Sequence, residues 1–193
     1  MQKLFPALLL MGILTILFVT ISLGGADDPV DEATITEVTA TTSEKELLVF
    51  AVLKNSFTPE MIQGLHSGIP VHFSFFLELV QKGKSWTDKK LVSLKFMHTL
   101  TYDTLKEIYR VDLEETQTNG STYTSLIKAR KAVNEINNLK LIKLAQLQPD
   151  NTYLLRIKAE LYKKTLPMNL HYLLPFLSWW DIETDWHTIE FSY

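Results

Sequence analysis

The segment VHFSFFLELVQKGKSWTDKKLVSLKFMHTLTYD, residues 71–103, decides the fold of this chain. Apolar residues recur at every second position on both sides of the polar connection QKGKSWTDKK, which is the spacing of half-buried β-strands. The faces predicted to be buried carry Val71, Phe73, Phe75, Leu77 and Leu79, then Val92, Leu94, Phe96, Leu100 and Tyr102. Phe76 and Val80 interrupt the otherwise polar opposite face of the first strand. We therefore expect an antiparallel hairpin with one face in the core.

The same alternation appears elsewhere in the chain. It predicts two strands before the hairpin, in ATITEVTATT (33–42) and KELLVFAVLK (45–54), and a third strand after it at 106–114, behind the turn TYDT. LKLIKLAQLQ (139–148) and TYLLRIKAELYKK (152–164) flank the turn cluster Pro149–Asn151, which predicts a second hairpin. DWHTIEF (185–191) is expected to be the last strand.

Two segments change to helical spacing. In TPEMIQGLHSG (58–68), Thr58 is the expected N-cap, Pro59 suits the first turn, and Gly64 or Gly68 ends the helix. The second helix is predicted to start after Thr124 or Ser125 and to stop at Asn137 and Asn138. Its apolar positions fall three or four residues apart, at Leu126, Ala129, Val133 and Ile136.

About seven strands with hairpin-length connections and one or two short helices favour an antiparallel β-sandwich, with an immunoglobulin-like topology as the leading prediction. The length after the N-terminal apolar segment suits one domain, at residues 34–193, behind a polar linker at 27–33.

The N-terminal apolar segment is expected to be a targeting signal. Twenty-three residues between Lys3 and Asp27 carry no charge, which suits both a signal peptide and a membrane-spanning helix. Gly24 and Ala26 fit a cleavage site before Asp27. Residues 1–26 are therefore a signal peptide or a hydrophobic anchor helix. Both interpretations predict export across the cytoplasmic membrane, to the periplasm or to the outer side of the inner membrane.

Composition excludes several classes of function. The chain contains no cysteine, which rules out disulfides, thiolate metal ligands and cysteine nucleophiles. Its formal net charge is -3, so no basic field is expected to hold nucleic acid.

The stretches GLHSGIPVHFSFFLELVQKGKSWTD and LTYDTLKEIYRV, with the tryptophan-rich end WWDIETDWHTIEF, carry a family resemblance. Together with the apolar leader they resemble the bacterial family called domain of unknown function 4390. The resemblance covers nearly the whole chain after the leader. It implies an exported bacterial protein with a mostly β domain, and it supplies no catalytic residues.

The histidines give weak support for a metal or ligand site. The five histidines lack HxH and HExxH spacing, and the expected faces of His72 and His98 diverge. His98 is expected to be a half-buried strand residue, while His171 and His187 flank the aromatic tail. A loop-borne ligand site at His66 and Ser67 is a less favoured alternative to a purely structural SGIP turn. We therefore predict no metal and no cofactor.

Two pairs of neighbouring carboxylates could in principle support acid–base chemistry. The pairs Asp181 with Asp185 and Glu114 with Glu115 are expected to be solvated charges. Asp103, next to Tyr102, is expected to accept a local backbone hydrogen bond in a turn. No catalytic residue is predicted, and we expect a protein that is not an enzyme.

The C-terminal stretch LPMNLHYLLPFLSWWD is dense in large apolar residues. Its side chains either fill the core or contact a membrane or partner; the candidates for such contact are Tyr172, Phe176, Trp179 and Trp180. The favoured function is a non-catalytic exported or membrane-tethered interaction module, with the membrane bound through the N-terminal segment and an envelope protein as partner. The alternative is a domain that binds a small apolar ligand or assists a sensor.

Overall fold

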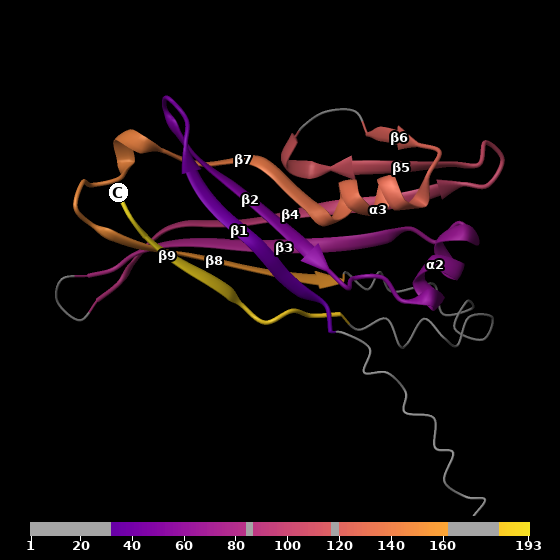
Figure 1. The fold of residues 1–193 in the computed structure, drawn as a ribbon, viewed down its shortest axis with the longest axis horizontal. Helices are drawn as coiled ribbons and strands as arrows, with labels where there is room; N and C mark the ends of the chain where they lie inside the picture. The colour runs from indigo at the N-terminus through magenta and orange to yellow at the C-terminus, as the bar shows by residue number, and fades with distance from the viewer. Residues whose placement is uncertain (1–31, 84–86, 117–119, 162–181) are drawn as a thin grey trace, which may run out of the picture. The chain divides into compact units, whose positions relative to one another are not determined.

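The computed structural model describes residues 32–83, 87–116, 120–161 and 182–193, all within one compact unit, Glu32–Tyr193 (Figure 1). The described part is mainly β, with two antiparallel sheets and two α-helices. The expectation of a mainly β antiparallel fold with one or two short helices is confirmed. None of the helices in the described ranges is long and apolar enough to cross a membrane.

The smaller sheet has the order β1-β2-β7, with β1 at Thr34–Thr42, β2 at Glu46–Lys54 and β7 at Glu135–Lys143. The larger sheet has the order β6-β5-β4-β3-β8-β9. Its strands are β3 (Val71–Gln81), β4 (Lys89–Asp103), β5 (Ile108–Leu113), β6 (Ser121–Tyr123), β8 (Thr152–Leu161) and β9 (His187–Ser192).

The predicted central hairpin is confirmed as β3 and β4. Phe75 pairs with Phe96 and Leu77 with Leu94, which places the alternating apolar residues of both strands on one face. Phe73, Phe75, Leu77 and Leu79 are fully buried. Burying a side chain of this size contributes about 2 kcal/mol, so this face anchors the core.

A single core joins the two sheets and both helices. Buried side chains from β2, α2, β3, α3 and β8 belong to one hydrophobic cluster, represented by Val49, Met61, Phe73, Val133 and Ile157. β1 of the smaller sheet also contacts β8 and β9 of the larger sheet directly.

The first predicted helix is confirmed as α2, Pro59–His66. The Thr58 hydroxyl accepts a hydrogen bond from the backbone N–H of Met61 at 3.3 Å, the expected N-cap. The helix passes through buried Gly64 and ends beside Gly68, whose φ of 86° lies in the left-handed region that glycine tolerates. Gly68, rather than Gly64, marks the end of the helix.

The second predicted helix is shorter than expected. α3 spans Leu126–Asn134, and β7 begins immediately at Glu135, so Ile136 reaches the core from a strand. Ile136 pairs with Ala51 of β2, which lies far away in the sequence. The predicted helix was too long because an apolar residue three positions after Val133 fits the buried face of a helix and can equally be buried from a strand.

The predicted hairpin between 139–148 and 152–164 is wrong. β7 pairs with β2, whereas β8 pairs with β3 and β9, so the two strands belong to different sheets. Between them the 3-10 helix η2, Leu144–Gln146, leads the chain away from the smaller sheet, and the Leu144 N–H donates to the Lys45 carbonyl at 2.8 Å. The turn cluster was correctly located, but it connects two sheets.

The strand order of the two sheets differs from that of the predicted immunoglobulin-like topology. Strands β3 to β6 form a consecutive meander within a six-stranded sheet, and the other sheet has three strands. Immunoglobulin constant domains divide seven strands four and three between sheets, with Greek-key connections. The topology therefore does not match that prediction.

Candidate functional site

His98 is the most deeply placed titratable side chain of β4. Its exposed fraction is 0%, because Phe75 and Phe96 contact it with ring centroids 4.6 and 5.6 Å away. The expectation of a half-buried His98 is corrected to a fully buried one. The predicted divergence from His72 is confirmed, since His72 lies on the opposite face and its Nδ1 meets the Thr99 hydroxyl at 2.9 Å.

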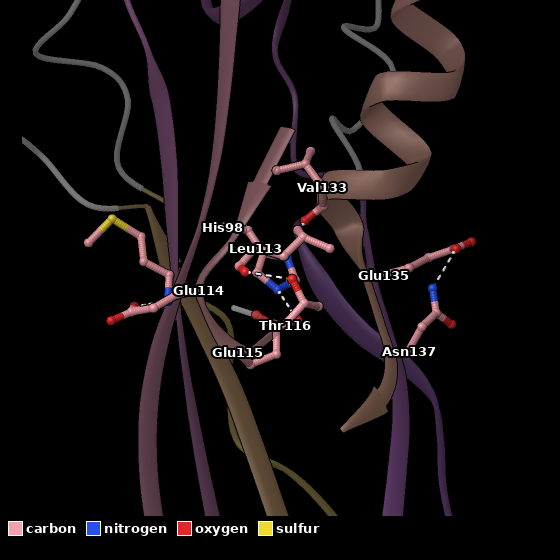
Figure 2. A network of polar contacts seen from close by, with 9 residues as sticks. His98, Leu113, Glu114, Glu115, Thr116, Val133, Glu135 and Asn137 are labelled. Carbon is pink, nitrogen blue, oxygen red and sulfur yellow. Dashed lines mark hydrogen bonds and ion pairs between the residues drawn. The ribbon is translucent and has the colours of Figure 1, made fainter. Parts of the chain in front are cut away.

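Both ring nitrogens of His98 have hydrogen-bond partners (Figure 2). Nδ1 lies 2.8 Å from the Val133 carbonyl, and Nε2 lies 2.9 Å from Oε1 of Glu115. A carbonyl only accepts, so Nδ1 must carry a proton. A second proton then sits between Nε2 and Oε1, giving either an imidazolium with a carboxylate or a neutral imidazole with a carboxylic acid.

The adjacent residues Glu114 and Glu115 have separate partners. Glu114 accepts a hydrogen bond from the backbone N–H of Met97 at 2.8 Å, just beyond the last pair of the β4–β5 ladder. Glu115 turns to His98, and its Oε2 is buried with no hydrogen-bond partner among the described residues. The sequence expectation of solvated charges therefore fails for Glu115, whose side chain is 7% exposed.

The His98–Glu115 pair connects three elements. His98 lies on β4, Glu115 on the 3-10 turn η1 (Glu114–Thr116) after β5, and Val133 at the end of α3. Val133 presents one of the last carbonyls of the helix, where positive charge is favoured. Because both nitrogens are buried and bonded, the pair serves to hold these elements together.

A second cluster lies four residues beyond His98, near the C-terminal end of β4, where the sheet meets α2. His66 Nε2 lies 2.7 Å from the Tyr109 hydroxyl. The His66 ring packs edge-on against Tyr102 with centroids 5.1 Å apart, and Tyr102 and Tyr109 are 4.8 Å apart. His66 is exposed, Tyr102 is half-buried and Tyr109 is buried, so this three-ring cluster reaches from the core to the surface.

Tyr109 is held in its neutral form. Burial, and secondly the neighbouring Tyr102, raise the pKa of the Tyr109 phenol above its usual value. A neutral phenol next to an imidazole can donate or accept a hydrogen bond, and it is a poor base and nucleophile. Of the three rings, exposed His66 and half-buried Tyr102 are therefore the ones that a partner could reach.

Two polar residues near this cluster form hydrogen bonds with the backbone. The Ser67 hydroxyl donates to the Gln63 carbonyl at 3.0 Å, so it bonds to the backbone of α2. Asp103 accepts the backbone N–H groups of Leu105 and Lys106, each at 3.0 Å. The predicted turn role of Asp103 is confirmed, and His66 and Ser67 have separate hydrogen-bond partners.

Several predicted site residues lie outside the described residues. These are the leader positions Gly24 and Ala26, the contact candidates Tyr172, Phe176, Trp179 and Trp180, and His171 and Asp181. Of their partners, Asp185 is exposed before β9 and His187 opens that strand. Within the described ranges no group of three metal-ligating side chains is close enough to hold an ion.

A family model described as "Domain of unknown function (DUF4390)" matches residues 30–190. The chain belongs to this family. The match confirms the resemblance drawn from the sequence motifs. Neither the curated proteins nor the solved structures gave a match.

In this DUF4390 chain the two motif stretches meet in space. His66 comes from GLHSGIP and both tyrosines come from LTYDTLKEIYRV, and His66 and Tyr109 are 43 positions apart. The sequence pattern of the first stretch predicts only a helix end and a turn, and that of the second predicts only a turn and a strand. The missed signal was that Tyr102 and Tyr109 lie directly opposite each other across the turn, which makes a paired aromatic platform.

Proposed function

We propose that this protein is a non-catalytic interaction module, exported across the cytoplasmic membrane or tethered to it by the N-terminal apolar segment. The observation that carries the proposal is the three-ring cluster of His66, Tyr102 and Tyr109, which the two motif stretches build together at the surface. Tyrosines that present both a ring and a hydroxyl are enriched where proteins bind one another. An envelope protein is the proposed partner.

The chemistry of the titratable groups supports binding over catalysis. The buried histidine already uses both ring nitrogens inside the protein. The more exposed His66 faces a phenol whose raised pKa disfavours its anionic form. His66 lies within hydrogen-bond distance of the Tyr109 hydroxyl, but the raised pKa makes this phenol a poor nucleophile.

The edge strands of the sheets favour a partner that binds elsewhere than by adding a strand to a sheet edge. β1 and β7 are the edge strands of the smaller sheet, and each contains a residue with positive φ, Glu37 and Asn138, where the pairing is irregular. At one edge of the larger sheet, β6 has only three residues, which leaves the six-residue β9 at the other edge as the regular edge strand. Irregular or very short edge strands resist the addition of another strand.

We further propose that the two sheets form a β-sandwich with its own strand order. The shared core and the contacts of β1 with β8 and β9 support this arrangement. A sandwich would leave the loops and turns at its ends free to vary and to bind, as in other folds of this architecture.

The test is site-specific photo-crosslinking in bacterial membranes. A crosslinking amino acid at His66 should capture one discrete partner, and the same group at exposed Glu44, in the β1–β2 turn, should not. Substituting Tyr102→Ala should weaken the recovered complex by about 2 kcal/mol, the scale of an interface hot spot. Equal capture from both positions, or none from His66, would refute the proposal.

N-terminal sequencing of the purified chain completes the test. A start at Asp27 would favour a cleaved leader, and retention of Met1 would favour the anchor. The Tyr102→Ala variant needs a check of cooperative unfolding, because Tyr102 packs partly against the core.

A further inference from the structure

The surface beside the three-ring cluster carries the two most exposed large apolar side chains among the described residues. Leu105 is 95% exposed at the tip of the β4–β5 turn, and Ile127 is 80% exposed on the first turn of α3. The turn itself requires neither, since Asp103 closes it through its own carboxylate. Turn residues are usually polar, so Leu105 is an unusual choice at this tip, and with Ile127 it makes two exposed aliphatic side chains.

Leu105 and Ile127 lie at the same end of the larger sheet. Asp103 pairs with Ile108 at the base of the turn, and Tyr109 pairs with Tyr123 of β6, three residues before α3 begins. α3 contacts β5 and β6 directly. Figure 1 shows the β4–β5 turn, the start of α3 and α2 together at this end, with the β1–β2 turn at the opposite end.

Lysines surround these two side chains. Lys106 follows Leu105, while Lys128 and Lys131 share the exposed side of α3 with Ile127. The Lys106 and Lys131 side chains are 73% and 75% exposed, and their ion pairs with Asp103 and Glu135 are long, at 3.9 Å each. Exposed pairs of this kind are weak, so the ammonium groups can turn to another anion.

Charge is concentrated locally. Residues 120–134 hold three basic residues and no acidic one, while the β4–β5 turn holds Lys106 between the acidic Asp103 and Glu107. An anionic surface would therefore attract the α3 side of this end more strongly than the β4–β5 turn.

We propose that Leu105, Lys106, Ile127, Lys128 and Lys131, here called the aliphatic–basic end, contact the anionic lipids of a bilayer. Aliphatic tips flanked by lysines combine the two forces that hold peripheral proteins on membranes, namely apolar burial and attraction to acidic headgroups. Protein interfaces are instead depleted in lysine and rely on tyrosine, tryptophan and arginine. The composition therefore favours a lipid surface over a protein partner at this end.

The lipid contact rests on the proposed function, because only a domain held at a membrane would meet lipids. It would place the neighbouring three-ring cluster close to the bilayer, within reach of a membrane protein. The contact is distinct from the N-terminal segment, and it orients the domain.

The chain contains no cysteine, so single cysteines can report this contact in the full chain. Leu105→Cys and Ile127→Cys would carry an environment-sensitive fluorophore, with Glu44→Cys as the exposed control on the opposite turn. Each labelled protein is reconstituted with vesicles of phosphatidylcholine alone or of phosphatidylcholine mixed with phosphatidylglycerol.

We expect the labels at 105 and 127 to shift to blue on the anionic vesicles only, with the label at 44 unchanged. Adding Lys128→Gln or Lys131→Gln should shift the equilibrium toward the free form by about fivefold for each lysine, and higher salt should act the same way. Far-UV circular dichroism checks that each variant folds.

Labels at 105 and 127 that stay in water on both vesicle types would overturn the lipid contact and leave a protein as the occupant of this end. Equal shifts on neutral vesicles, or a shift at 44 as well, would also overturn it. If the crosslink from His66 still captured its partner, only the lipid inference would fall. Loss of that crosslink with intact shifts at 105 and 127 would instead remove the proposed protein partner.

Discussion

Glu115 and His98 face each other inside the protein, with Oε1 of the carboxylate 2.9 Å from Nε2 of the imidazole (Figure 2). The opposite nitrogen of His98 donates to the Val133 carbonyl, so the ring is held between a turn and the end of a helix. A buried polar pair of this kind is costly when one member is removed, because the other loses its partner without regaining water.

Replacing Glu115 tests whether the pair needs a charge or only a hydrogen bond. Glu115→Ala leaves Nε2 of His98 without its partner and should lower the free energy of unfolding by about 3 kcal/mol. Glu115→Gln can donate its amide N–H to a neutral His98 and should cost only about 1 kcal/mol. Urea unfolding of the two variants gives both values.

Glu114→Gln is the matched control, since its side-chain oxygen can still accept from the Met97 amide at the exposed neighbouring position. Its unfolding free energy should stay within about 0.5 kcal/mol of the parent. Equal losses for Glu115→Gln and Glu115→Ala would show that the carboxylate charge itself is required.

Local pattern was sufficient to predict the central hairpin. Alternation alone placed His98 on the face of Phe96 and Leu100 and His72 on the opposite face, as the structure has them. It did not reveal that Glu115 would lie against His98, because the approach depends on how the chain turns after β5. Sequence spacing describes one strand at a time, and the pair joins three elements.

Alkaline pH should destabilise the protein through Tyr109. Its pKa is raised in the folded state, chiefly by burial, so the folded protein keeps a proton that the unfolded chain releases near pH 10. The stabilisation is complete below the unfolded pKa and is lost as pH rises from there through the folded pKa. Tyr109→Phe removes this ionisation.

Urea unfolding at a series of pH values from about 8 to 11 compares the parent with Tyr109→Phe. The parent should lose stability more steeply above about pH 10 than the variant. Parallel curves would mean that other groups account for the alkaline loss.

Gly68 should resist substitution for a backbone reason alone. Its φ is 86°, and a Cβ added there would meet no heavy atom within 4 Å. Gly68→Ala should therefore cost about 1–2 kcal/mol through the left-handed conformation, without a steric clash. Gly68→Asn should cost less, because asparagine visits this region more readily. Thermal unfolding ranks the variants, and an alanine variant as stable as the parent would contradict the argument.

Long-range pairing is where the sequence was insufficient. Ile136 continues the helical spacing of Val133, but it lies in strand β7, where it pairs with Ala51 of β2. LKLIKLAQLQ and the following strand looked like neighbours because a turn separates them, whereas each pairs with a different sheet. Partner choice depends on which strands already form an edge, and that information is spread across the whole chain.

The hydrogen bond between His66 and Tyr109 can be measured by a double-mutant cycle. The two groups are 2.7 Å apart, and they join the end of α2 to the base of the β4–β5 turn. His66→Ala and Tyr109→Phe each remove one partner, and the double variant removes both. We expect a coupling free energy of about 1 kcal/mol from urea unfolding at neutral pH. Pairing Tyr109→Phe with Ser67→Ala, whose hydroxyl bonds only within α2, should give additive losses. Additivity in the His66 cycle as well would mean that the contact between these two motif stretches contributes nothing to stability.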